Sequence, residues 1–351
     1  MRLLLASVSI FQICLSAWSQ DITGDTNVPS PREIEITRLA AAGGSAEAQY
    51  LLGNYYYRGR GVATNQTLAV DWFQKAADQG NIWAQCCLGA CYLGGKGVTA
   101  DKAKAVAWFR KAADQGYPNA QYSLGLCYTH GDGVPADPKE ALKWYFLAGQ
   151  YGDDADAQFA VARCLYDGAG IKTNRSEAVN WYEKAAAQDI VAAQMLVGLS
   201  YWFGWDVNPD QPKAVEWFKR AAEQGEPQAF VFLSAAYLNV KGLRTNYIQA
   251  YKWGLLAREY VDPGMTSELA KMQRPMLPWQ VWKARRLAQE FKERRTIKPL
   301  LGYSVNTRNM YVLANLARAY RDQFKDRTAD ELVAANPYFM SGTNLAAFQP
   351  Y

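Results

Sequence analysis

The sequence predicts an all-α fold, a solenoid of about six helix-pair repeats, and three observations lead to it. An alanine recurs at intervals of 36, 36, 37, 36 and 36 residues, and a tryptophan follows each alanine by 24 residues. Each interval holds two segments with helical spacing of apolar residues, joined by a glycine loop. A fixed period of this length is typical of a repeat array, in which each unit forms part of the next unit's core. The markers are Ala48, Ala84, Ala120, Ala157, Ala193 and Ala229, with Trp72, Trp108, Trp144, Trp181, Trp217 and Trp253.

Three segments precede the array. Residues 1–19 start with a basic Arg2, continue as an apolar run too short to span a bilayer, and end in small residues before Gln20. They are predicted to be a secretory signal peptide, so the mature chain is expected to be secreted or periplasmic. Residues 20–31 are rich in turn-forming residues and are predicted to be a linker. Residues 32–45 are predicted to be an N-terminal capping half-repeat.

Residues 46–260 form the predicted repeat array. The first helix of each unit ends in a glycine loop, and an Asn or Asp then caps the second helix. Glycines inside the first helices, such as Gly53, cost about 1 kcal/mol against alanine, which predicts the close approach of a neighbouring backbone. The repeat tryptophan is predicted to fill the core between units. In the fifth and sixth units Asp206 and Val240 replace loop glycines, which leaves the loop geometry there open.

Two segments follow the array. Residues 261–296 are predicted to be a helical cap, with a helix at 277–295 that has a proline in its first turn. Its basic side chains are typical of a solvated helix face, and the alternative is contact with an acidic partner or a membrane surface. Residues 297–351 are predicted to be a helical extension and tail, with a helix at 307–324 and a capping box at 328–331.

The composition gives little support for catalysis. The chain has 351 residues, of which half are apolar, and a mild net charge of +5 that does not indicate a nucleic-acid partner. Its single histidine, His130, cannot build a triad or a usual metal site. The chain is therefore predicted to have no catalytic residues, no cofactor and no metal, and no transmembrane segment once the signal is removed. Neighbouring helices lie about 8–10 Å apart, more than the ~7 Å between Cα atoms that a disulfide allows, so buried thiols are favoured over disulfides.

Residues 85–116, QCCLGACYLGGKGVTADKAKAVAWFRKAADQG, closely resemble the repeat of the Sel1-like repeat family, relatives of the tetratricopeptide repeat. The resemblance covers about residues 46–260. It implies a right-handed α-solenoid with a concave surface, which the family uses as an adaptor to bind proteins.

A comparison of the units with one another predicts where a partner binds. Positions three, six and ten after the repeat alanine vary most in character and share one face of the first helix. By the family's geometry this face looks into the concave groove. The aromatic run at 201–207 is the strongest candidate for a binding hot spot, and its alternative is local repacking of an atypical unit. The predicted partner-binding residues are Asn54, Arg58, Leu126, His130, Arg163, Asp167, Leu199, Trp202, Phe203 and Trp205.

The predicted function is a protein–protein interaction scaffold or adaptor that binds a protein or peptide in the groove. One alternative is a binder of envelope glycans or cell wall that uses the groove aromatics. Another is a hydrolase acting on the cell envelope, for which the sequence shows no nucleophile–base pair and no metal-ligand set.

Overall fold

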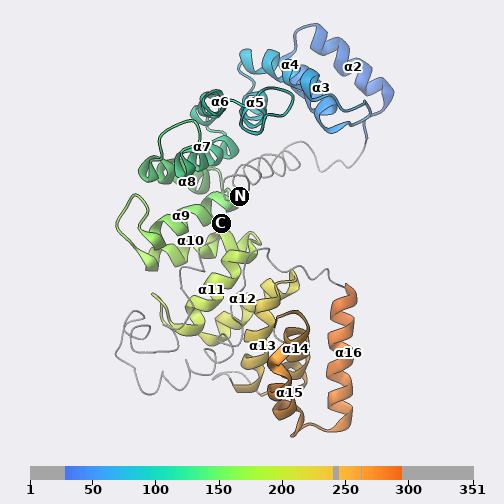
Figure 1. Ribbon diagram of the computed structural model, residues 1–351, viewed down its shortest axis with the longest axis vertical. Helices are drawn as coiled ribbons and strands as arrows, with labels where there is room; N and C mark the ends of the chain where they lie inside the picture. The colour runs from blue at the N-terminus through green and yellow to red at the C-terminus, as the bar shows by residue number, and fades with distance from the viewer. Residues whose placement is uncertain (1–27, 240–244, 262, 295–351) are drawn as a thin grey trace. The chain divides into compact units, whose positions relative to one another are not determined.

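The computed structural model describes residues 28–239, 245–261 and 263–294. These ranges contain fifteen α-helices, one short 3-10 helix and no strand, which confirms the predicted all-α fold (Figure 1). The predicted signal peptide, the helix at 307–324, the capping box at 328–331 and Val240 lie outside the described residues.

First and second helices alternate along the chain, as the repeat predicts. The first helices are α3 (Ala46–Arg58), α5 (Ile82–Gly94), α7 (Pro118–His130), α9 (Ala155–Asp167), α11 (Val191–Phe203) and α13 (Pro227–Asn239). The second helices are α4 (Gln66–Asp78), α6 (Lys102–Asp114), α8 (Pro138–Tyr151), α10 (Arg175–Ala187), α12 (Gln211–Glu223) and α14 (Tyr247–Tyr260). Helix α2 (Pro31–Ala42) precedes them, and η1 (Pro263–Met265), α15 (Thr266–Gln273) and α16 (Pro278–Arg294) follow. The chain divides into two compact units, of which unit 1 holds α2 to α9 and unit 2 holds α10 to α16.

Side-chain caps start the second helices. The Asp101 carboxylate accepts a hydrogen bond of 3.0 Å from the Lys104 backbone N–H, which satisfies an amide that has no partner inside the helix. The first helices α3, α5, α7, α9 and α11 end at glycines in the left-handed region, such as Gly95 with φ 64°. The same type of cap, as predicted, is present at Asn65, Asp137, Asp210 and Asn246.

The second glycine of each loop is required by the neighbouring repeat. A Cβ on Gly97 would lie 2.2 Å from the backbone oxygen of Gln66, and one on Gly133 would lie 2.2 Å from that of Lys102. In the fifth repeat Asp206 takes this place and keeps the left-handed backbone, with φ 59°. The substitution of this glycine therefore leaves the turn unchanged, at the cost of strain in a non-glycine residue.

The ring that fills the space between the two helices of a repeat belongs to the residue after the tryptophan. Phe109 is fully buried, and a Cβ on Gly89 of the first helix would lie 2.8 Å from two of its ring carbons. The glycines thus admit an aromatic ring, and the predicted approach of a neighbouring backbone is present beside it, since a Cβ on Gly53 or Gly125 would lie 3.2 Å from the carbonyl oxygen of Ala69 or Ala141. The same pairing joins Gly53 to Phe73, Gly125 to Tyr145 and Gly198 to Phe218.

The repeat tryptophans are less uniform than the sequence predicts. Trp108 is only half-buried, and the Lys111 ammonium lies 3.9 Å from the centre of its ring. The prediction that this tryptophan is the main core residue is therefore wrong for part of the array. Trp72 and Trp217 are also half-buried, whereas Trp144, Trp181 and Trp253 are buried.

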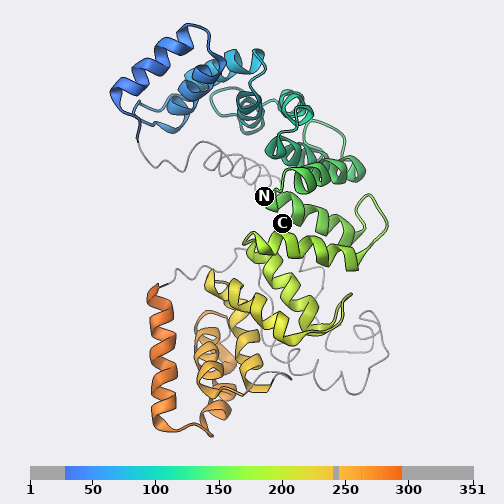
Figure 2. The same cartoon turned by 180° about the vertical axis from the view of Figure 1, so that it is seen from behind.

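The sixth repeat connects the array to the C-terminal helices. Ser234 stands where four of the other first helices carry glycine and α9 carries Ala162, and Gly254 stands where the aromatic ring is expected. A Cβ on Gly254 would lie 2.8 Å from a methyl carbon of Leu269 in α15. Helix α16 packs beside α14, where Phe291 meets the edge of Trp253 with ring centres 5.1 Å apart (Figure 1 and Figure 2).

Candidate partner-binding surface

In five of the six first helices, a buried glutamine after the repeat alanine ties the helix to the one before it. The Gln85 amide donates to the Ala77 carbonyl at 3.2 Å and accepts a hydrogen bond of 2.7 Å from Gln115. These side chains satisfy backbone carbonyls at a helix end that is shielded from water. These glutamines therefore hold the helices together and are not available to bind a partner. Equivalent bonds to a preceding carbonyl are made by Gln49, Gln121, Gln158 and Gln194.

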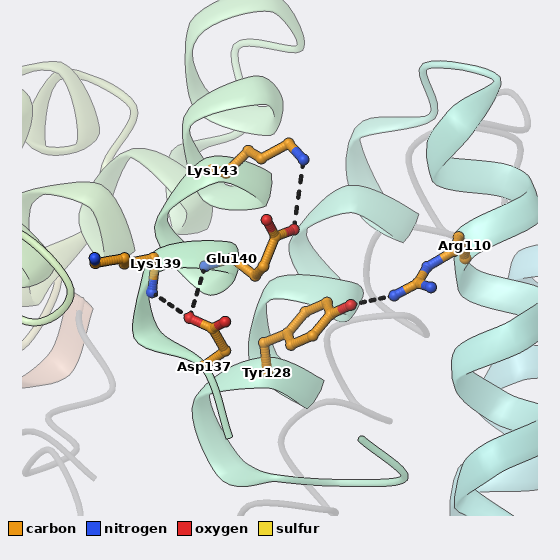
Figure 3. Close-up of polar contacts among 6 residues, drawn as sticks. All are labelled: Arg110, Tyr128, Asp137, Lys139, Glu140 and Lys143. Atoms are coloured by element: carbon orange, nitrogen blue, oxygen red, sulfur yellow. Dashed lines mark hydrogen bonds and ion pairs between the residues drawn. The ribbon is translucent and has the colours of Figure 1, made fainter. Parts of the chain in front are cut away.

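A second series of contacts joins successive repeats through a first-helix tyrosine. The Arg110 guanidinium of α6 donates to the hydroxyl of Tyr128 in α7, eighteen residues later (Figure 3). Arg38 makes the same contact with Tyr56 at 3.4 Å. Figure 3 also shows the Asp137 cap and the exposed Lys143–Glu140 ion pair on the next helix, whose atoms lie 3.4 Å apart.

The residues at the positions of this arginine and this tyrosine vary in other repeats. Tyr201 donates to Glu183 at 2.9 Å, and the Lys213 ammonium lies 2.7 Å from the Tyr201 hydroxyl and 2.7 Å from Glu183. Burial opposes the charge of Lys213, but hydrogen bonds to Glu183 and Tyr201 outweigh it and raise its pKa. In the fourth repeat Leu165 replaces the tyrosine, and the residue at the opposing position is Phe146. Sequence reasoning missed this series, although the spacing of eighteen residues in the pairs Arg38–Tyr56, Arg110–Tyr128 and Glu183–Tyr201 was a signal.

Four predicted site residues end the first helices. Arg58, His130, Asp167 and Phe203 are the last residues of α3, α7, α9 and α11, each directly before a left-handed glycine. His130 and Asp167 are exposed, and Arg58 and Phe203 are half-buried. Leu126 and Arg163, one helical turn earlier, are also half-buried. Within unit 1 the structure thus places Arg58, Leu126, His130, Arg163 and Asp167 at equivalent ends of the first helices; we call these five residues the helix-end surface.

Three other predicted site residues are buried, so their assignment to an accessible surface is wrong. Trp202 is 2 % exposed and meets the edges of Phe218 and Phe232, with ring centres 5.9 Å from each. Leu199, 3 % exposed, belongs to the same core. Asn54 is 5 % exposed, and its side-chain oxygen makes no hydrogen bond with any described residue. The burial of Trp202 fits the alternative of local repacking for this residue.

The two remaining aromatic candidates form a pair in unit 2. The rings of Phe203 and Trp205 stack with centres 4.7 Å apart and an angle of 18° between their planes. Both residues are half-buried, and Phe203 also meets the edge of Phe232 at 6.4 Å. The core side of the pair is therefore fixed, while its other side remains accessible.

The start of α9 carries two carboxyl groups whose burial raises their pKa. Burial raises the pKa of Asp154 to about 6, although a hydrogen bond from the Ala157 backbone opposes the shift. Burial also raises the pKa of Asp156, on the same helix. Arg163 lies two turns after Asp156, and its Nε atom is buried and makes no hydrogen bond with a described residue. This end of unit 1 therefore holds polar groups that the fold satisfies only in part.

The described residues offer little chemistry beyond these contacts. Within 28–239, 245–261 and 263–294, no three His, Cys, Asp or Glu side chains are grouped so as to hold a metal ion. The cysteines at positions 86, 87, 91 and 127 are buried, Cys164 is half-buried, and in this part of the chain none forms a disulfide. None of the helices in the described ranges has the length and apolar character needed to cross a membrane.

Paired helices that repeat the same packing and hydrogen bonds define an α-solenoid built from helix-pair repeats. The Sel1 repeat model matches residues 46–81, 84–117, 118–153, 155–190, 191–226 and 231–259. The chain therefore belongs to the Sel1 repeat family, whose members commonly mediate protein–protein interaction and are typically not enzymes.

Several solved structures are similar to this chain, and two of them share the repeat fold at 26% and 30% identity. One is c5321, a protective antigen of uropathogenic Escherichia coli strains with an SLR fold, at 26% identity and a TM-score of 0.62. The similarity covers 82% of this chain and only 61% of that protein. The other is a Sel1 repeat protein from Oxalobacter formigenes, at 30% identity and a TM-score of 0.54, with 64% of this chain and 99% of that one covered. Comparison with curated protein sequences gives no match.

Proposed function

We propose that this chain is an exported scaffold that binds a protein or peptide partner through the ends of its first helices. The observation that carries the proposal is a contrast between equivalent positions. The glutamine, the capping residue and the ring after the tryptophan recur because they hold repeats together. The last residue of the first helix instead changes from Arg58 through Gly94 and His130 to Asp167 and Phe203. The fold needs no particular side chain there.

In unit 1 the helix-end surface presents charges of both signs beside Leu126. In unit 2 the Phe203–Trp205 pair presents apolar area. Aromatic anchors at interfaces typically cost 2 kcal/mol or more when truncated, whereas charges at the rim mainly affect the association rate. A protein or peptide with an apolar anchor and mixed charge fits these surfaces.

The test begins with capture of a partner from an envelope fraction, followed by titration calorimetry with the purified partner. We expect Phe203→Ala and Trp205→Ala each to weaken binding by about 30-fold or more. Arg163→Glu should change the association rate and its salt dependence. Phe146→Ala is the matched control, because Phe146 is an aromatic residue of a second helix that is 40 % exposed. This variant should bind the partner as the wild type does.

Circular dichroism of each variant checks that the helices are intact. If both aromatic variants bind as tightly as the wild type and as Phe146→Ala, the proposal is wrong about the site. Retention on isolated glycan with no protein partner would instead support the alternative of an envelope glycan binder.

A further inference from the structure

The outward face of α16 carries the two most exposed tryptophans of the described residues. Trp279 is 55 % and Trp282 61 % exposed, next to Leu277 at 57 %. The repeat tryptophans, in contrast, are buried or half-buried. Two indoles that stay in water on one helix serve no purpose in the packing of the array.

The position of these residues on the helix makes them one patch. At about 100° per residue, Trp279, Trp282, Lys283 and Arg286 share an arc of about 100° on the solvent side. The opposite side carries Val281, Ala284 and Ala288, which are buried. The Arg286 guanidinium lies 5.5 Å from the centre of the Trp282 ring. We call Trp279, Trp282, Lys283 and Arg286 the α16 patch.

Positive charge outweighs negative charge around the patch, although Glu290 and Glu293 follow it on the same side of α16. Between Glu268 and Glu290 the chain contains Lys271, Arg274, Lys283, Arg285 and Arg286, and it contains no carboxylate side chain. Lys271 pairs with Glu268, and Arg286 pairs with Glu290 at 2.7 Å. Lys283 and Arg285 are exposed on the two sides of the tryptophans and form no ion pair among the described residues. The patch therefore joins accessible indoles to the positive charge of Lys283, with Arg285 beside it, while the charge of Arg286 is balanced by Glu290.

We propose that the α16 patch binds the surface of a membrane that contains anionic lipids. Indole rings prefer the interface between water and lipid, where the ring is in contact with acyl chains and its N–H with headgroups. Lysine and arginine near the surface add attraction to anionic headgroups. Stable attachment without a spanning segment takes an apolar and a basic contribution together, and this patch supplies both. The contact is separate from the helix-end surface, so the chain can hold a partner at a membrane.

The experiment is co-sedimentation with sonicated vesicles of phosphatidylcholine alone or of phosphatidylcholine with 30% phosphatidylglycerol, roughly the scale of anionic charge in a natural leaflet. The chain from Gln20 onward is used, since it keeps every described residue and omits an apolar segment that would itself enter lipid. We expect binding to the anionic vesicles that weakens as salt is raised. Trp279→Ala with Trp282→Ala should weaken it by about tenfold or more, and Lys283→Ala with Arg286→Ala by roughly 30-fold.

Two double variants outside α16 serve as controls: one removes exposed apolar side chains and the other removes exposed positive charges. Ile36→Ala with Leu39→Ala removes two side chains of α2 that are 57 % and 65 % exposed, and Arg32→Ala with Lys139→Ala removes two exposed charges. Both should bind vesicles as the wild type does. Because α16 packs through its other face, the patch variants should keep their helical circular dichroism, which is measured for each.

Three results would overturn the proposal. One is the absence of binding to anionic vesicles at millimolar lipid, and another is equal binding by the patch and control variants. The third is binding of soluble polyglutamate, dependent on the two tryptophans, without binding of vesicles, because this would assign the patch to an acidic protein segment.

Discussion

Phe109→Ala tests which side chain holds a repeat together. Its ring is fully buried, and it lies so close to Gly89 that a Cβ there would come within 2.8 Å of two ring carbons. Truncation leaves a cavity next to a residue that has no side chain to fill it. Removal of a buried phenylalanine typically costs 3–5 kcal/mol, and a cavity that cannot collapse places the cost in the upper part of that range. We therefore expect a loss of about 4–5 kcal/mol.

Trp108→Ala is the matched comparison, because Trp108 precedes Phe109 and has the larger side chain. Trp108 is half-buried, so part of its ring is in water in both the folded and the unfolded state. Truncation also removes the contact of the ring with the Lys111 ammonium 3.9 Å away, which contributes about 0.5–1 kcal/mol at an accessible site. We expect a total loss of about 2–3 kcal/mol, smaller than that of Phe109→Ala because part of the Trp108 ring is never removed from water.

The assay is urea unfolding followed by far-ultraviolet circular dichroism. With a slope of about 3 kcal/mol per M, the Phe109 variant should unfold more than 1 M earlier and the Trp108 variant less than about 1 M earlier. Because a repeat array can unfold in segments, hydrogen exchange of α5 and α6 is measured in parallel. A loss for Trp108→Ala equal to or larger than that for Phe109→Ala would refute the assignment of the core ring.

Three further predictions concern single side chains. Asn65→Ala should destabilise unit 1 by about 1 kcal/mol because Asn65 caps α4, whereas Asn65→Asp should retain stability in urea unfolding. Asp206→Gly should stabilise unit 2 and Asp206→Ala destabilise it, each by about 1 kcal/mol, because φ is 59° at this position; thermal unfolding of both variants at constant pH measures this. Burial raises the pKa of Asp154 from 3.8 to about 6, so the folded state keeps a proton that the unfolded state loses, and the stability from this group falls as pH rises from about 4 to 6. Asp154→Asn should therefore be more stable than the wild type above pH 6, by at most about 3 kcal/mol, and this difference should vanish below pH 4; urea midpoints that differ equally at all pH values would contradict it.

The sequence predicted the periodic features of the fold because each has a local cause. The capping residues and the left-handed glycines act within a few residues of the chain, so their type and spacing were sufficient to place them. Whether Trp108 or Phe109 is the core ring, in contrast, does not depend on the neighbouring residues in the sequence. Adjacent residues on a helix point about 100° apart, and only the position of Gly89 on the partner helix shows which ring is enclosed.

The site was harder to predict for the same reason. Trp202, Leu199 and Asn54 occupy positions that vary between repeats, and variation alone does not distinguish an accessible residue from one that repacks a local core. Trp202 is enclosed because Phe218 and Phe232 meet it from two other helices. The α16 tryptophans posed the opposite difficulty: they lie outside the repeat period, so no comparison between repeats could indicate their exposure.

The central claim is that recurring side chains build the array while the variable ends of the first helices bind a partner. Hydrogen exchange of the chain with and without the captured partner tests it most directly. The account predicts that the partner slows exchange in the last turns of α7, α9 and α11 and in the loops that follow them, at residues 128–134, 165–171 and 201–207. Exchange in the second helices α6, α8 and α12 should change little. Protection confined to those second helices, with no change at the ends of the first helices, would contradict the account.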